Sequence, residues 1–158
     1  MKPLVKNGDL LFWRGKGFFA WVIRLFTRSQ YCHVGVAYYV AGILCVVEAK
    51  AKSGVRLVDI TSENMPDAYI SLPYYFRFGR DSELECLTYL GEPYGWVDAL
   101  RAGLGLRDTS KGVECAEFAA SVMRTMGMLM PTVKTPESVR LAAIQQGGTE
   151  VKEPIKRG

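Results

Sequence analysis

The chain contains very little histidine and has no long apolar run. Its 158 residues include one histidine, His33, and four cysteines with no CxxC spacing. No stretch approaches the roughly 18 apolar residues that are needed to span a bilayer. Asn7, Gly8 and Asp9 interrupt the first apolar residues before the hydrophobic segment of a signal peptide can form. We therefore expect a cytoplasmic protein whose cysteines are free thiols.

Several binding signatures are also absent. The sequence has neither a glycine-rich phosphate loop nor a GxGxxG fingerprint. A zinc site needs three or four ligands, and one histidine without a close cysteine pair does not supply them. The net charge of +4 comes from scattered lysines and arginines, unlike the dense basic patch of a nucleic-acid-binding protein. We predict no cofactor, no metal and no nucleic-acid partner.

Length and composition fit one domain, since 49% of the residues are hydrophobic. Apolar runs and their periodicity predict the secondary structure. The expected strands cover 10–13, 33–40, 43–49, 56–60 and 71–78, and the expected helices cover 18–28, 81–90, 96–106, 113–126 and 136–146. This order predicts an α+β fold with a small antiparallel sheet packed against helices. Residues 1–146 would form the single domain and residues 147–158 a polar C-terminal tail.

A hairpin is predicted between the two longest strands, with Ala41 and Gly42 as its turn. A two-residue loop there places Glu48 opposite Gly35 and diagonal to His33, on the same face of the sheet. Glu48 lies in an apolar run, where a carboxylate needs a partner, and the single histidine is the obvious one. We predict that Glu48 orients the His33 imidazole. The alternative is an exposed glutamate on an edge strand.

Cys115 is predicted to lie at the start of a helix, just after Gly112. A helix N-terminus presents unpaired amides and the positive end of the helix dipole, which lower the pKa of a thiol and can hold an oxyanion. A cysteine and a histidine that are remote in sequence can meet in space as a thiolate–imidazolium pair. We predict Cys115 as the nucleophile and His33 as its base. The alternative is a buried structural cysteine.

Aromatic side chains supply further candidates. Tyr31 and Tyr94 carry hydroxyl groups that can hold an oxyanion or a substrate group, although packing is the common role of a tyrosine. Phe18, Trp21 and Phe26 fall on one stripe of an expected helix. That stripe predicts either packing on the sheet or peripheral contact with a membrane.

A set of short segments follows a distinctive order along the chain. They are Gly8-Asp9-Leu10-Leu11-Phe12, Ile23-Arg24-Leu25-Phe26-Thr27-Arg28-Ser29 leading into His33-Val34-Gly35-Val36, Val47-Glu48-Ala49, Gly91-Glu92-Pro93-Tyr94, Cys115-Ala116-Glu117-Phe118 and Thr135-Pro136-Glu137. This ordered set resembles the circularly permuted NlpC/P60 hydrolases, papain-like thiol enzymes in which the histidine precedes the cysteine. Lecithin:retinol acyltransferase-like proteins belong to the same permuted group, and their Asn-Cys-Glu-His-Phe motif is similar to residues 114–118. Ala116 stands where the permuted hydrolases often carry serine.

The resemblance implies a permuted papain-like fold with Cys115 as nucleophile, His33 as base and Glu48 as the third polar residue. It also implies attack on an amide or ester carbonyl and an acyl-enzyme that water or another acceptor resolves. We therefore expect a peptidase or amidase that acts on a small peptide or acyl substrate, such as a cell-wall-derived or γ-linked amide. The alternatives are a lipid-directed hydrolase or acyltransferase, and a non-catalytic binding module that keeps the pocket.

Overall fold

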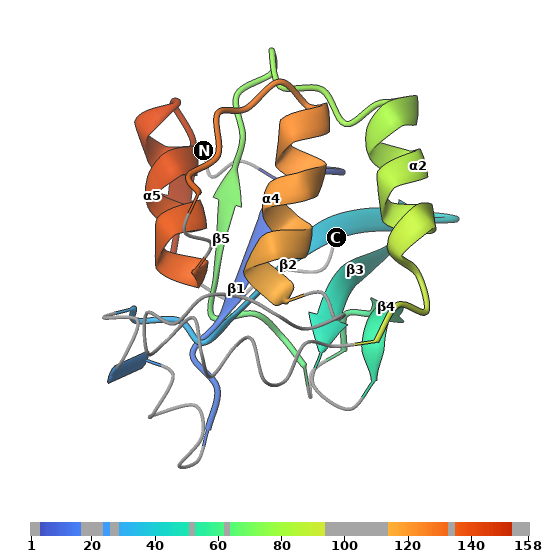
Figure 1. Ribbon diagram of the computed structural model, residues 1–158, viewed down its shortest axis with the longest axis horizontal. Coiled ribbons are helices and arrows are strands. Elements are labelled where there is room, and N and C mark those ends of the chain that lie inside the picture. Colours follow the sequence, from blue (N-terminus) through green and yellow to red (C-terminus); the bar gives the residue numbers. More distant parts are fainter. Residues whose placement is uncertain are drawn as a thin grey trace.

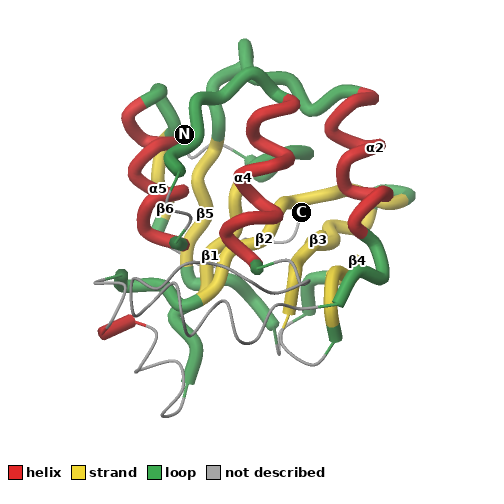
Figure 2. The backbone as a smooth tube through the Cα atoms, in the orientation of Figure 1, coloured by secondary structure: helices red, strands yellow, loops and turns green. Residues whose placement is uncertain are grey.

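A computed structural model describes residues 4–16, 24–25, 29–50, 53–61, 64–93, 114–132 and 135–152. In these ranges one antiparallel sheet has the strand order β4-β3-β2-β1-β5-β6. Its strands are β1 (Leu10–Trp13), β2 (His33–Val40), β3 (Ile43–Lys50), β4 (Gly54–Asp59), β5 (Ala68–Ser71) and β6 (Thr149–Val151). The helices α2 (Arg80–Tyr89), α4 (Cys115–Thr125) and α5 (Pro136–Gln145) lie side by side, with α4 in the middle (Figure 1). Figure 2 shows these helices on one face of the sheet.

The predicted α+β class with a small antiparallel sheet is confirmed, and most element bounds differ by no more than two residues from the predicted ones. The strand predicted over 71–78 is wrong, because β5 ends at Ser71. Pro73 has no amide hydrogen to donate to a sheet, and the chain turns at the two residues that follow it. The predicted helix over 96–106 lies outside the described residues. Of the one over 18–28, Arg24 and Leu25 are described, and both are helical.

The structure corrects the start of the predicted polar tail. Residues 149–151 form β6, which pairs with β5 so that Ile70 lies opposite Glu150. Gly147 has a φ of 96°, and a Cβ on Gly148 would lie 2.8 Å from the main-chain oxygen of Ala143. The two glycines therefore turn the chain tightly against the end of α5 and return it to the sheet.

The register of β2 and β3 is as predicted. Val36 lies opposite Val47 and Val40 opposite Ile43, so the loop consists of Ala41 and Gly42. Both loop residues have positive φ, 50° and 82°, which is typical of a turn that matches the twist of a hairpin. Because residues pair one to one from this turn as far as Val36 and Val47, the turn fixes how the rest of β3, including Glu48, is placed along β2.

Apolar side chains cover both faces of the sheet. The larger cluster lies between the sheet and the helices and includes the fully buried Phe12 and Val34. Phe118 and Val122, one turn apart on α4, belong to the same cluster. A smaller cluster, which includes Leu11, Ala37 and Val46, covers the opposite face. Helix α4 is thus anchored across the centre of the sheet, and this packing places its first residue.

The segment after α2 covers the main chain of the edge strand β4. The Val55 amide donates to the Glu92 oxygen at 2.9 Å, and the Gly91 amide donates to the Val55 oxygen at 2.9 Å. Gly54 has a φ of +68°, and a Cβ there would lie 2.2 Å from the Glu92 oxygen. This close approach requires glycine at position 54.

A buried carboxylate joins the N-terminal turn to the end of β5. Asp9 is inaccessible to solvent and accepts hydrogen bonds from the amides of Lys6 and Leu72, both at 2.9 Å. Burial raises the pKa of Asp9 to about 6, against the lowering effect of these hydrogen bonds. The carboxylate thereby fixes where the chain enters β1 and where it leaves β5.

Asp9→Asn should lower the free energy of unfolding by about 1–3 kcal/mol, as measured by urea denaturation. Asparagine has one acceptor oxygen for two main-chain donors, so its amide group would face one of them. The exposed Asp59 offers a control, since Asp59→Asn should change stability by less than about 0.5 kcal/mol. Equal stabilities of the Asp9 variant and the wild type would contradict this account.

Candidate active site

The structure brings together the three side chains that the sequence predicted as a site. His33 is the first residue of β2, Cys115 is the first residue of α4, and Glu48 lies in β3. His33 Nε2 lies 2.5 Å from Glu48 Oε2, and the imidazole also forms a hydrogen bond with the Cys115 side chain. Because Glu48 occupies Nε2, Nδ1 is the ring nitrogen that remains for the Cys115 sulfur. A carboxylate, an imidazole and a thiol therefore form one chain of contacts.

The charged forms of His33 and Glu48 stabilise each other. Burial alone would lower the pKa of His33, but hydrogen bonds with Cys115 and Glu48 raise it to about 9. Burial would raise the pKa of Glu48, but the hydrogen bond and charge of His33, with a further hydrogen bond from Arg56, lower it to about 2. At neutral pH the imidazole is thus a cation held by a carboxylate, and this cation faces the Cys115 side chain.

Arg56 is a site residue that sequence reasoning missed. It lies directly opposite Glu48 in the β3–β4 pair. Its Nη2 and Nε donate to Glu48 Oε1 at 2.8 and 3.1 Å, which leaves Oε2 for His33. The turn around Ser53 and Gly54 is the signal that could have found it, because a short turn there pairs Glu48 with Arg56.

Trp13 and Gly35 shape the space around the imidazole, and neither was predicted to belong to the site. Trp13 lies opposite His33 in the β1–β2 pair, with the two ring centroids 5.3 Å apart. Its indole Nε1 donates to the Asn64 oxygen at 2.8 Å, which fixes the ring. A Cβ on Gly35 would lie 2.4 Å from Val46 Cγ2 and 3.3 Å from Glu48 Cβ. Glycine at position 35 therefore leaves the room that Glu48 occupies.

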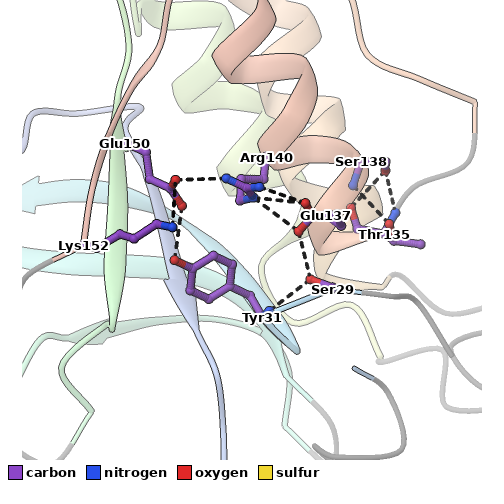
Figure 3. A network of polar contacts seen from close by, with 8 residues as sticks. All are labelled: Ser29, Tyr31, Thr135, Glu137, Ser138, Arg140, Glu150 and Lys152. Atoms are coloured by element: carbon purple, nitrogen blue, oxygen red, sulfur yellow. Dashed lines mark hydrogen bonds and ion pairs between the residues drawn. The ribbon is translucent and has the colours of Figure 1, made fainter. Parts of the chain in front are cut away.

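The structure places Tyr31 in a different cluster from the one predicted. The Tyr31 side chain is fully buried, and its hydroxyl donates to Glu150 Oε1 at 3.2 Å. Burial and the neighbouring Glu150 charge raise the pKa of Tyr31 to about 12. Its hydroxyl thus belongs to the polar network of Figure 3, where its partner is Glu150, and it does not act as the predicted oxyanion donor. Tyr94 and the predicted membrane-facing side chains lie outside the described residues; those side chains are Phe18, Trp21 and Phe26.

The network in Figure 3 holds the segment that leads into β2. Arg140 of α5 bridges Glu137 and Glu150, with Nη2 and Nη1 each 2.9 Å from a carboxylate oxygen. Ser29 donates to Glu137 Oε2 at 3.3 Å and accepts from the Tyr31 amide at 3.0 Å. Two charged residues of α5 and one of β6 therefore fix the chain just before His33.

Two further expectations concern the cysteines and the membrane. The four cysteines, Cys32, Cys45, Cys86 and Cys115, are free thiols, as predicted. Within the described ranges no helix has both the length and the apolar character needed to cross a membrane.

Comparisons with known proteins bear on the fold. No family model and no curated protein matches the sequence. The fold is similar to the crystal structure of the metalloprotein YiiX from Escherichia coli O157:H7, described as DUF1105, with a TM-score of 0.63. The match covers 94% of this chain and 97% of that chain at 17% sequence identity, so the likeness concerns the fold alone.

These comparisons overturn the family resemblance. We expected a member of the circularly permuted NlpC/P60 group, which includes the lecithin:retinol acyltransferase-like proteins, but no family model matches and a solved structure with a similar fold is a DUF1105 metalloprotein. The resemblance was based on segments of a few residues, and such short motifs recur in unrelated chains. In the part of this chain that the structure describes, no three His, Cys, Asp or Glu side chains gather closely enough to hold a metal ion.

Gly35→Ala should lower the free energy of unfolding by about 1–3 kcal/mol, because the added methyl group overlaps Val46 and presses on Glu48. Urea denaturation measures the effect. Gly79→Ala is the matched control, since a Cβ at Gly79 meets no atom within 4 Å. If both variants lost the same stability, the close approach at Gly35 would not be the cause.

The charge pair also predicts how stability depends on pH. The folded-state pKa of His33 is raised from 6.5 to about 9, so its stabilising contribution is complete below pH 6.5 and disappears as pH rises through 9. The contribution of Glu48, whose pKa is lowered from 4.5 to about 2, is present above pH 4.5 and disappears as pH falls toward 2. Wild-type unfolding free energy should therefore fall by about 1–3 kcal/mol between pH 6.5 and 9.

Urea titrations of the wild type and His33→Gln across this pH range provide the test. The variant has no imidazole, so its stability should lack the fall between pH 6.5 and 9. Parallel curves for the two proteins would contradict the charge pair.

Proposed function

We propose that the protein is a thiol hydrolase that cleaves an amide or ester bond in a small peptide or acyl substrate. The observation that carries the proposal is the contact chain Cys115–His33–Glu48, with the thiol on the first residue of a helix. A nucleophile beside a base that a third group orients is the arrangement that covalent acyl transfer requires. The raised pKa of His33, about 9, supports an imidazolium facing the sulfur.

The reaction would proceed in two halves. In the first, the Cys115 sulfur attacks the carbonyl carbon and forms a C–S bond, and the bond to the leaving nitrogen or oxygen breaks as His33 protonates that atom. In the second, neutral His33 accepts a proton from water, whose oxygen attacks the thioester carbon. The C–S bond then breaks and the acid product leaves. Glu48 keeps the imidazole ring in one orientation through both halves.

The N-terminus of α4 would stabilise the oxyanion of each half-reaction. Glu114 is the N-cap, and its side chain makes no capping hydrogen bond to the first-turn amides. Uncapped amides at a helix N-terminus and the positive end of the dipole favour negative charge. We also propose a permuted papain-like arrangement, supported by the order of the chain, in which the histidine strand precedes the cysteine helix.

The alternative functions differ in what they need beyond this chain of contacts. A lipid-directed hydrolase or acyltransferase needs an apolar surface for the acyl chain, and the segment predicted for it lies largely outside the described residues. A non-catalytic binding module needs no activated sulfur. Measurement of sulfur reactivity therefore separates the enzyme from the binding module.

Iodoacetamide at pH 6 should alkylate Cys115 at least about tenfold faster than Cys86, because the Cys115 sulfur contacts the His33 side chain at the start of a helix, and such surroundings make a cysteine reactive. Cys86 is an internal reference, since burial raises its pKa to about 12 and it is 3% exposed, against 6% for Cys115. Mass spectrometry of the digested protein gives the rate at each cysteine. His33→Ala should remove the difference.

A second variant separates loss of the pair from general unfolding. Glu48→Gln keeps a polar group of the same size and should slow Cys115 labelling less than His33→Ala, while Cys86 labelling stays unchanged in both variants. If wild-type Cys115 reacts no faster than Cys86, the thiol hydrolase is refuted and the binding module becomes the better reading.

A further inference from the structure

Arg56 binds the carboxylate of Glu48 through the oxygen that His33 does not use. Its Nη2 lies 2.8 Å from Glu48 Oε1, while His33 Nε2 lies 2.5 Å from Oε2. The Glu48 side chain is 6% exposed and that of Arg56 is 34% exposed, so the guanidinium group reaches both water and a buried anion. Glu48 therefore has two cations beside its one negative charge whenever His33 is protonated.

The sheet fixes the place of this guanidinium group. Arg56 lies directly opposite Glu48 in the β3–β4 pair, and the amide and carbonyl of the preceding Val55 are both bonded to the segment that follows α2. The side chain donates twice to one carboxylate oxygen, from Nη2 and also from Nε at 3.1 Å, which restrains its rotation. The main chain and two hydrogen bonds thus determine where the positive charge lies.

Other elements present further groups to the His33–Glu48 pair. Cys115 of α4 forms a hydrogen bond with the His33 side chain. Burial raises the pKa of Glu48, and hydrogen bonds with His33 and Arg56 lower it. Lys50, exposed on the same strand as Glu48, lowers that pKa further through its charge. Two lysine or arginine cations therefore act on the carboxylate, and Arg56 is the one that binds it directly.

Proton transfer from His33 changes what Glu48 requires. In the first half-reaction the imidazole gives its Nδ1 proton to the leaving group, and the Cys115 sulfur becomes part of an uncharged thioester. Nε2 keeps its hydrogen and its contact with Glu48, but the positive charge of the ring is lost. A buried carboxylate without a cation is strongly unfavourable, so Glu48 alone would favour a His33 that retains its proton. With Arg56 in place, Glu48 keeps one ion pair in the acyl-enzyme.

We propose that Arg56 is a positioning residue of the thiol hydrolase: it supplies the positive charge that Glu48 requires once His33 has given up its proton. Neutral His33 can then act as the base on water in the second half-reaction. This inference rests on the proposed function and adds to it a residue that acts through Glu48. Arginine suits the role because its guanidinium group stays charged at any pH at which enzymes work.

An NMR titration of the imidazole tests the proposal directly, because the protein has one histidine and its ring signals belong to His33. The wild-type midpoint should lie near the pKa of about 9. Arg56→Gln removes the cation that is bonded to Glu48 and should raise the midpoint by about one pH unit. A purely structural role of Arg56 predicts lower stability with an unchanged midpoint.

Two control variants separate the charge of Arg56 from its hydrogen bonds and from general effects of charge. Arg56→Lys keeps the positive charge, so its midpoint should stay within about 0.5 pH unit of the wild type. Lys50→Gln removes an equal charge that acts on Glu48 without binding it, and it should move the midpoint less than Arg56→Gln does. Arg56→Met, which also lacks the charge, provides the comparison if Arg56→Gln does not fold.

A double variant shows whether Arg56 acts through the carboxylate. In the Glu48→Gln background no negative charge remains at position 48, so the additional change Arg56→Gln should move the His33 midpoint by less than about 0.3 pH unit. A shift as large as in the wild-type background would contradict an effect through Glu48.

The activated ester p-nitrophenyl acetate tests the catalytic consequence. The Cys115 sulfur attacks its carbonyl carbon, a C–S bond forms, and p-nitrophenolate leaves in a burst. Water then attacks the thioester while neutral His33 accepts its proton, the C–S bond breaks and acetate leaves. The steady rate should rise with pH as His33 loses its proton. At about pH 7.5, Arg56→Gln should turn over about tenfold more slowly than the wild type, with an unchanged burst.

The outcomes distinguish this inference from the proposed function. A burst in both proteins, with a His33 midpoint in Arg56→Gln that is equal to or below that of the wild type, would overturn the role of Arg56 and leave the thiol hydrolase standing. Absence of a burst in the wild type would refute the hydrolase, and the role of Arg56 in it as well. Circular dichroism establishes that each variant is folded.

Discussion

The buried carboxylate of Glu48 is the constraint on which the site depends. At 4% exposure it requires compensation, because a lone charge in an apolar sheet is strongly unfavourable. Compensation comes from both neighbouring strands, through His33 on one side and Arg56 on the other. Each carboxylate oxygen has its own partner, so the imidazole can neither rotate nor lose its charge without leaving Glu48 partly unpaired. The same pairing that stabilises the sheet therefore orients the ring toward Cys115.

Two structural supports bring the thiol to that ring. Packing of Phe118 and Val122 against the sheet places the start of α4, while the Arg140 network holds the chain that enters β2. These two supports share no side chain. The distance between sulfur and imidazole is thus set by the whole core, which suits the two-step reaction that we propose, because its reacting groups must stay in contact.

The sequence predicts contacts that a nearby turn determines, and it does not predict contacts between segments that are remote in sequence. The turn at Ala41 and Gly42 fixes the register of its hairpin within a few residues, so the pairing of His33 with Glu48 could be inferred. The position of Arg56 opposite Glu48 depends on a second turn, whose length the sequence pattern does not determine. Strand β6 forms only by pairing with β5, which is far away in the sequence, and the contact of Tyr31 with Glu150 is equally remote. The family assignment failed because its motifs are too short to exclude chance.

The segment that covers the edge strand β4 affects whether two molecules of this protein can pair through their sheets. An edge strand offers free amides and carbonyls to any other strand, and such edges are where sheets join into aggregates. Here the Val55 amide and carbonyl are occupied by Glu92 and Gly91, and Gly54 permits the contact. The strand that carries Arg56 is thereby protected against pairing with a second sheet. A side chain at position 54 would do more than strain one turn: it would push the Glu92 main chain away and leave the Val55 amide and carbonyl open to another strand.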